Sequence, residues 1–210
     1  MKKIILSVAA VFAFGFANAQ EEAKSEAAYG FVKGDMYVEG GISVRSDDDS
    51  NSFSFNPKFG YMMTDQISVG GDLDLGSSKQ DRIGALDPDM KSTSWGIGAF
   101  ARYNFLELND KRFVAYGEVG LGFSSTNVEN DYIDPIPDSD DTTNGIKANV
   151  DLGMNYFITK NFAAVFTVAN IISYNNENPE NGDSRNSFSM DINLFNNPFA
   201  QAQFGLLYKF

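Results

Sequence analysis

The sequence predicts an all-β fold, an eight-stranded antiparallel up-and-down transmembrane β-barrel. Two patterns carry this prediction. From Gly34 onward, apolar and polar residues alternate in runs of about ten, as expected for strands whose two faces have unlike surroundings. The connections between the runs alternate between short and long, so all tight turns fall at one end of the barrel and the long loops at the other. A soluble sandwich of two sheets has no reason to follow this alternation.

Eight runs form the predicted barrel, and each is bounded by Asn, Asp, Ser, Gly or Pro. They are Gly34–Arg45, Asn51–Met63, Ile67–Ser77, Ser92–Phe105, Arg112–Thr126, Gly145–Phe157, Phe162–Tyr174 and Phe199–Phe210. Strands of globular proteins usually have about 5 to 6 residues, whereas a tilted strand that crosses a bilayer has about 9 to 11. The lengths of the runs therefore favour strands that span a membrane.

The connections fall into two classes. The tight ones are Thr64–Gln66, Leu106–Lys111 and Ile158–Asn161, and the long polar ones are Gly76–Lys91, Asn127–Asn144 and Asn175–Pro198. The first connection on the long side, Ser46–Ser50, is short and departs from the pattern. With an even number of strands, both termini of the chain lie on the side of the tight turns, as in barrels of bacterial outer membranes.

Apolar side chains share one face of each predicted strand, and we expect this face to contact lipid. On three strands it comprises Phe53, Phe55, Phe59, Tyr61 and Met63; Trp95, Ile97, Ala99, Ala101, Tyr103 and Phe105; and Ile146, Ala148, Val150, Leu152, Met154 and Tyr156. Aromatic residues gather beside the tight turns, at Tyr61, Tyr103, Phe105, Phe113, Tyr156, Phe162, Tyr208 and Phe210. Aromatic residues at one end of the strands are typical of a girdle at a membrane interface.

The start of the chain has the features of a secretory signal peptide. Two lysines precede the apolar run Ile4–Phe16, and Ala-Asn-Ala follows it as a small-residue cleavage site. The run is shorter than the about 20 residues that a membrane-spanning helix needs. We therefore expect residues 1–19 to be removed on export, residues 20–33 to form an N-terminal arm with no assigned function, and residues 34–210 to form the barrel.

The composition excludes several classes of function. A formal charge of −12, from 28 acidic and 16 basic side chains, repels nucleic acid. The chain has no Cys, which removes disulfides, zinc-thiolate sites and thiol nucleophiles, and no His, which removes most general-base and triad chemistry. We therefore predict no catalytic residues, no cofactor and no metal site.

The end of the chain carries a more specific signal. The last strand ends in the sequence Gln-Phe-Gly-Leu-Leu-Tyr-Lys-Phe. It resembles the C-terminal assembly signal of bacterial outer-membrane β-barrel proteins, whose positions are filled by Gln203, Gly205, Tyr208 and Phe210. The resemblance implies recognition by the barrel-insertion machinery and residence in the outer membrane. With the export segment and the even strand number, the chain resembles the small porin-like barrel domain of the OmpA, OmpX and OmpW types.

Charged residues lie on the face opposite the lipid face. They are Glu39, Lys58, Asp72, Asp74, Arg102, Glu118, Lys147, Asp151 and Lys209. The interior of an eight-stranded barrel is only wide enough for side chains, and a buried charge is costly unless it is paired. Because the sign alternates between neighbouring strands, we predict an ion-pair network that plugs the lumen. The alternative is a thin file of water that passes small ions.

Glycines accompany the charges on the inward face. They are Gly60, Gly70, Gly76, Gly96, Gly98, Gly120, Gly122 and Gly153. We expect them to leave room for long charged side chains and to ease the curvature of the strands.

The long loops are acidic. They carry Asp47, Asp48, Asp49, Glu129, Asp131, Asp134, Asp138, Asp140 and Asp141. Oxygen-rich loops can bind Ca²⁺, but the EF-hand spacing is missing, so we interpret them as solvated loops. Divalent ions that bridge them to phosphorylated lipid remain a hypothesis.

The last loop contains a strand-like run in which Phe188, Met190, Ile192 and Leu194 alternate with polar residues. It either extends the last two strands beyond the membrane or exposes a sheet edge that pairs with a partner.

These observations predict a non-enzymatic integral outer-membrane protein with a largely plugged lumen, which contributes to envelope structure or surface interaction. Its partners would be outer-membrane lipid, the insertion machinery and a surface ligand met through the acidic loops. Related barrel hydrolases and acyltransferases use an active-site His, which this chain lacks. The alternatives are a narrow pore for small solutes or ions, a route for an apolar ligand, and a soluble lipocalin-like carrier with its apolar face turned inward.

Overall fold

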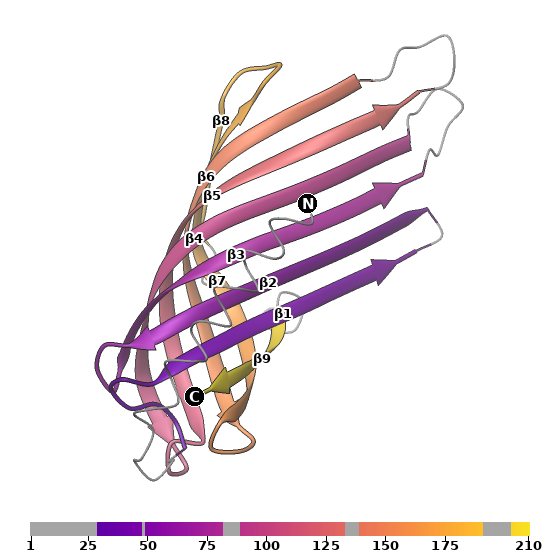
Figure 1. The fold of residues 1–210 in the computed structure, drawn as a ribbon. Coiled ribbons are helices and arrows are strands. Elements are labelled where there is room, and N and C mark those ends of the chain that lie inside the picture. Colours follow the sequence, from indigo (N-terminus) through magenta and orange to yellow (C-terminus); the bar gives the residue numbers. More distant parts are fainter. Residues whose placement is uncertain (1–28, 48, 82–88, 133–138, 191–202) are drawn as a thin grey trace.

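The strands form one antiparallel sheet that closes on itself. The computed structural model describes residues 29–47, 49–81, 89–132, 139–190 and 203–210. In sheet order the strands are β6-β5-β4-β3-β2-β1-β9-β7-β8, and a further pairing of β6 with β7 completes a ring of eight (Figure 1). This ring confirms the predicted fold class. Within the described ranges no helix has the length and apolar character needed to span a membrane.

The strands have the following bounds. They are β1 Met36–Ser46, β2 Ser50–Met62, β3 Ile67–Gln80, β4 Asp89–Leu108, β5 Phe113–Asp131, β6 Ser139–Phe157, β7 Phe162–Pro179, β8 Arg185–Met190 and β9 Gln203–Lys209. Seven of the eight predicted strands recur with shifted ends. The eighth is described only from Gln203, and the first four residues predicted for it lie outside the described residues.

β8 and β9 lie along the same edge of β7 at different heights. β9 pairs with Phe162–Thr167 and β8 with Ile172–Glu177, while β6 covers the other edge. Both strands run antiparallel to β7 and therefore in the same direction. The described part of the strand-like run, β8, thus extends the sheet by pairing with β7. This agrees with the sequence interpretation in which the run extends the last two strands. Ile192 and Leu194 lie outside the described residues.

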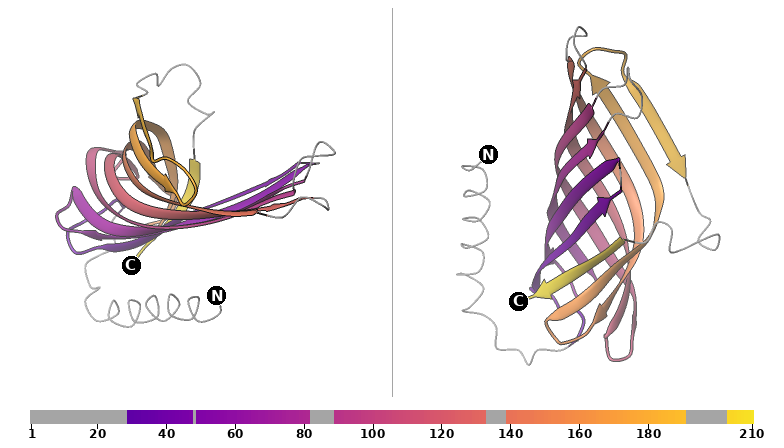
Figure 2. Two further views of the ribbon diagram at one scale, coloured as in Figure 1. Left: turned by 90° about the horizontal axis from the view of Figure 1, so that it is seen from above. Right: turned by 90° about the vertical axis from the view of Figure 1, so that its right-hand side faces the viewer.

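The strands extend further on the long-loop side than predicted. β5 reaches Asp131 and β6 begins at Ser139, although the sequence suggested a loop from Asn127 to Asn144. β7 likewise continues to Pro179. Beyond the membrane both faces of a strand meet water, so the alternation of apolar and polar residues ends and a polar strand resembles a loop. The long strands project together on this side of the ring (Figure 2).

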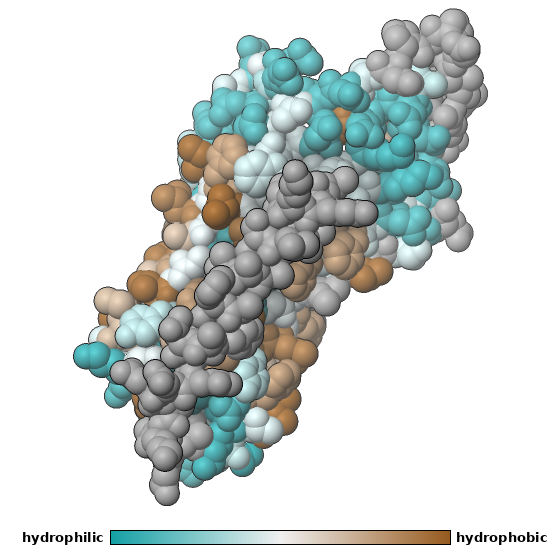
Figure 3. Space-filling model, viewed as in Figure 1, coloured by the Kyte–Doolittle hydropathy of each residue, from teal (hydrophilic) through white to brown (hydrophobic). Residues whose placement is uncertain are grey.

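Apolar side chains on the outside of the ring are exposed, as a lipid-facing surface requires. On β4 the exposed residues include Trp95, Ile97, Tyr103 and Phe105. Tyr61, Tyr156, Phe162 and Tyr208 are exposed beside the tight turns, where the aromatic girdle was predicted. Apolar residues gather in a band along the middle of the visible face, and polar residues cover the long-loop end (Figure 3).

A small apolar core fills the turn end of the barrel interior. It consists of Phe31, Tyr37, Met62, Phe100, Val114, Tyr116, Phe157, Ala163, Val165 and Leu207. Three of its aromatic residues stand directly opposite an inward glycine, in the pairs Tyr37 with Gly60, Phe100 with Gly70, and Tyr116 with Gly153. A Cβ on any of these glycines would collide with the opposite ring. At these positions the glycines make room for aromatic rings and not, as predicted, for long charged side chains.

We predict that Gly153→Ala destabilises the barrel by about 1–3 kcal/mol, the usual cost of overpacking a core. The added Cβ would meet the Tyr116 ring and lie 2.8 Å from the Phe166 carbonyl oxygen, so both a ring and the backbone must move. Urea unfolding of the refolded protein in lipid vesicles measures this loss. Gly117→Ala is the matched control, since its Cβ would meet only Leu152 at 3.8 Å. Equal unfolding midpoints for the two variants would contradict the prediction.

Candidate functional site

Arg102 lies at the centre of the lumen. It extends inward from β4, and only 2% of the residue is exposed. Its Nη1 is 2.7 Å from Glu39 Oε2 on β1, and its Nη2 is 2.7 Å from Glu118 Oε2 on β5. β1 and β4 are not neighbours in the ring, so the contact with Glu39 crosses the lumen. A single guanidinium thus ties two carboxylates from different sides of the barrel.

Lys58 extends the same cluster. It reaches from β2 across the lumen to form an ion pair with Glu118 on β5. Glu118 therefore accepts hydrogen bonds from both cations. In addition to Nη2, Arg102 Nε donates to Glu118 Oε2 at 2.8 Å. We call Glu39, Lys58, Arg102 and Glu118 the central network. Because every charge in it has an opposite partner, the cost of burying each charge is offset.

Aromatic rings enclose the central network. The guanidinium carbon of Arg102 is 3.9 Å from the centre of the Tyr116 ring, and 5.6 Å from those of Tyr37 and Phe100. A cation over an aromatic face is attracted by the ring quadrupole. The Tyr37 hydroxyl is itself fixed by a hydrogen bond of 2.9 Å with Ser68 Oγ. The rings hold the guanidinium in the plane that reaches both carboxylates.

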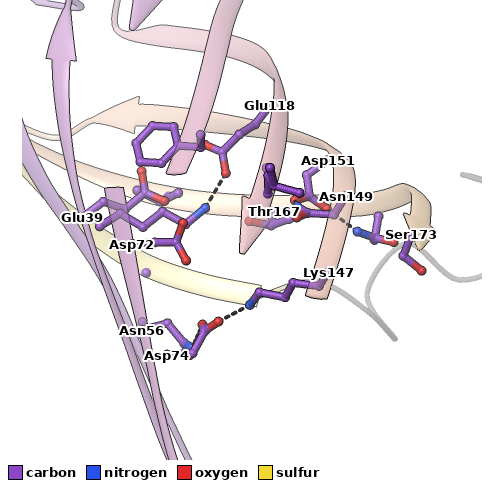
Figure 4. A pocket seen from close by; sticks show the side chains of 18 of the residues that line it. Glu39, Asn56, Asp72, Asp74, Glu118, Lys147, Asn149, Asp151, Thr167 and Ser173 are labelled. Carbon is purple, nitrogen blue, oxygen red and sulfur yellow. Dashed lines mark hydrogen bonds and ion pairs between the residues drawn. The ribbon is translucent and has the colours of Figure 1, made fainter. Parts of the chain in front are cut away.

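A second polar group lies on the long-loop side of the central network. Lys147 on β6 forms an ion pair with Asp74 on β3, again across the lumen, and Asn56 Nδ2 donates to Asp74 Oδ1 at 2.5 Å. Asp151 accepts hydrogen bonds from the amides of Asn149 and Asn170. Figure 4 shows these side chains converging from the barrel wall. They line a cavity of about 750 Å³, whose lining runs from Glu39 and Glu118 to Asn175.

The predicted lumen charges therefore fall into separate groups. Glu39, Lys58, Arg102 and Glu118 meet in the central network, and Asp74 meets Lys147 above it. Asp72 is the register partner of Lys58, and Asp151 is held by amides. Lys209 belongs to neither group, since its Nζ lies 3.2 Å from Asp35 Oδ2 at the turn end.

The pairing agrees only in part with the predicted one. The sequence suggested pairs between neighbouring strands, and Arg102–Glu118 on β4 and β5 is such a pair. The other three pairs, Lys58–Glu118, Arg102–Glu39 and Lys147–Asp74, cross the lumen. In so narrow a ring, a long side chain reaches the far wall as readily as the next strand.

Several residues of the site were missed by reasoning from the sequence. Tyr37 and Tyr116 each precede a glutamate of the central network by two residues and therefore share its inward face. This spacing was a usable signal. The amides of Asn56, Asn149 and Asn170 carry no such mark, because polar residues of this type are equally common on the strands beyond the membrane.

The C-terminal signal residues have a structural setting as well. A Cβ on Gly205 would lie 2.9 Å from the Gly40 carbonyl oxygen, so glycine allows β9 to approach β1 closely. Tyr208 is exposed on the outside and packs edge-on against Phe162 and Phe210. Nothing is described for the side chain of Gln203.

The acidic loops show no metal centre in the parts that are described. Among these residues, no group of three or more acidic side chains is placed to hold an ion. Asp48, Asp134 and Asp138 lie outside the described residues.

We predict that Arg102→Met lowers stability by about 3–5 kcal/mol, because it leaves buried carboxylates without their cation. Urea unfolding in vesicles measures the loss. The control is Lys91→Met, which removes a surface pair with Asp131 whose side chains are 50% and 44% exposed. Such a pair contributes about 0–1 kcal/mol. Adding Glu39→Gln to Arg102→Met should restore part of the stability, because Glu39 then carries no unpaired charge while Glu118 keeps its partner Lys58. A loss no greater than that of Lys91→Met would contradict the central role of Arg102.

Comparison with known proteins agrees with this architecture. The family model described as outer membrane protein beta-barrel domain matches residues 6–210. No curated protein sequence matches the chain significantly.

Solved structures with a similar fold include three barrels. The attachment invasion locus protein Ail of Yersinia pestis has 16% sequence identity and a TM-score of 0.44, and the match covers 85% of this chain and 100% of Ail. OprG of Pseudomonas aeruginosa has 15% identity and a TM-score of 0.45, with 86% of this chain and 98% of OprG covered. Outer membrane protein W of E. coli has 18% identity and a TM-score of 0.40, with 85% of this chain and 99% of that protein covered. On the match of its whole barrel to the family model, the chain belongs to the outer membrane protein beta-barrel domain family and is an integral protein of the outer membrane.

Proposed function

We propose that this protein is a non-enzymatic barrel with a closed lumen, which contributes to the structure of the envelope and presents its long-loop end to partners outside the cell. The central network is the observation that carries the proposal. Arg102 and Glu118 are almost wholly buried, and their partners reach them across the lumen. A hydrated ion would have to separate these pairs in order to pass.

Two layers support closure. The central network fills the middle of the barrel with charges that neutralise one another. Toward the tight turns, the apolar core around Tyr37, Val114 and Leu207 fills the interior with side chains that are fully buried. Water and ions therefore meet first an ionic layer and then an apolar one.

The long-loop end is the surface that a partner would meet. β3 to β7 continue beyond the apolar band as strands with polar faces, and acidic side chains such as Asp47 and Asp49 in the first loop and Asp140 on β6 add negative charge. Such a surface favours partners with basic groups. During assembly, the barrel-insertion machinery would read Gln203, Gly205, Tyr208 and Phe210, and lipid would then surround the apolar face.

The second candidate function is a narrow pore. It is favoured by the cavity of about 750 Å³, whose lining includes Asp74, Lys147, Asn149 and Asp151. In this alternative the charged groups would select ions, and an exchange of partners around Arg102 would open the path.

Single-channel recording separates the two candidates. We expect the mature protein, refolded in detergent and inserted into a planar bilayer, to show no discrete conductance steps. Its insertion is checked by the electrophoretic shift between folded and heat-denatured barrels. Reproducible steps from the unaltered protein would favour the pore and overturn the closed-lumen proposal.

A further inference from the structure

The described residues that precede β1 lie inside the mouth of the barrel. Phe31 is fully buried. The centre of its ring is 5.3 Å from that of Tyr37 on β1 and 5.2 Å from that of Phe157 on β6, the latter edge-on. This ring therefore occupies the turn end of the lumen between strands on different sides of the barrel. The sequence had assigned no function to this part of the N-terminal arm.

Polar contacts fix the segment around the rim of the mouth. Lys209 Nζ on β9 donates to the Gly30 carbonyl oxygen at 2.6 Å. Arg112 Nη2 donates to Tyr29 Oη at 2.5 Å, and its guanidinium carbon is 4.1 Å from the centre of the Tyr29 ring. The Lys33 amide donates to Asp65 Oδ1 at 2.8 Å. These anchors lie on the last strand, before β5 and in the turn between β2 and β3, so they surround the mouth.

The backbone of the segment is suited to this path. Gly30 has a φ of +74°, a conformation that side-chain-bearing residues rarely adopt. A Cβ at Gly30 would also lie 2.5 Å from Lys111 Cβ. Glycine therefore allows the chain to turn into the mouth against the tip of the β4–β5 turn.

Behind Phe31 the interior contains two amides that have no hydrogen-bond partner among the described residues. Asn104 and Asn155 are 1% and 0% exposed, and both polar atoms of each side chain are unpartnered. Asn104 follows Arg102 by two residues on β4, and Asn155 lies on β6 opposite Val114. Both are on the turn side of the central network. Buried amides without partners are costly, and they would be solvated if the mouth opened.

From these contacts we propose that Tyr29–Lys33 is a stopper that docks in the turn-side mouth of the barrel. It shields the buried amides of Asn104 and Asn155 from water. Release of this segment would hydrate Asn104 and Asn155 and remove Phe31 from the apolar layer that lies in series with the central network. The inference deepens the closed-lumen proposal and rests on it, because it places a second closure in series with the central network.

Thiol labelling tests the stopper directly, since the chain has no cysteine of its own. Asn155→Cys is made in the full mature chain, with Phe31 intact or replaced by Gln, and reacted in micelles with a charged methanethiosulfonate reagent. We expect labelling to be at least about tenfold faster with Phe31→Gln, because burial of one phenylalanine favours the docked state by about that factor or more. An unchanged rate would overturn the stopper.

Asn149→Cys provides the matched control. Asn149 lines the cavity on the other side of the central network, so its labelling rate should not depend on Phe31. An equal acceleration at both cysteines would mean that Phe31→Gln loosens the whole barrel, and it would overturn the proposal. If Phe31→Gln does not fold, Tyr29→Ala serves instead, because it removes the tie to Arg112 at the rim and leaves the apolar core intact.

Conductance distinguishes this inference from the proposed function. We expect steps only when Phe31→Gln is combined with Arg102→Ser and Glu118→Ser, because the docked segment would block the lumen even after the central network is removed. Steps from the Arg102 and Glu118 variant with Phe31 intact would overturn the stopper but leave the closed wild-type lumen in place. Steps from the unaltered protein would overturn the closed lumen, while the labelling rates would still decide whether the segment docks.

Discussion

The requirement that every charge inside a narrow barrel be paired governs this structure. Arg102 meets it with two carboxylates from different walls, Glu39 and Glu118, and Lys58 meets it by sharing Glu118. The surrounding sequence serves these contacts. Tyr37, Phe100 and Tyr116 lie near the guanidinium, and glycines stand opposite all three rings and leave space for them. Without the glycines, the rings and the guanidinium would not share the same narrow cross-section.

The interior changes in character along the barrel axis. At the long-loop end it is a polar cavity whose carboxylates are held largely by amides and one lysine. The ionic layer follows in the middle, and the apolar core with Phe31 lies at the turn end. This order agrees with the proposed function, in which the long-loop end faces the outside of the cell and the turn end is closed.

The alternation of apolar and polar residues in the sequence predicts much of this architecture. Alternation identified the membrane strands and their lipid faces, and it assigned the charged residues to the opposite face because a strand has only two. Three features were out of reach for physical reasons. The polar ends of β5 and β6 have no apolar face to mark them, and partner choice across a lumen depends on curvature, which a linear pattern does not contain. The docking of Phe31 depends on a mouth that exists only after the strands have closed.

The cross-lumen direction of the ion pairs has a consequence for the way the barrel forms. Of the four ion pairs described in the lumen, only Arg102–Glu118 joins adjacent strands. The other three cannot exist in a flat or half-curled sheet, so their charges stay hydrated until opposite walls meet. These three ion pairs therefore form together in the last step of closure. Closure is then cooperative, and a partly curled barrel is not a stable intermediate.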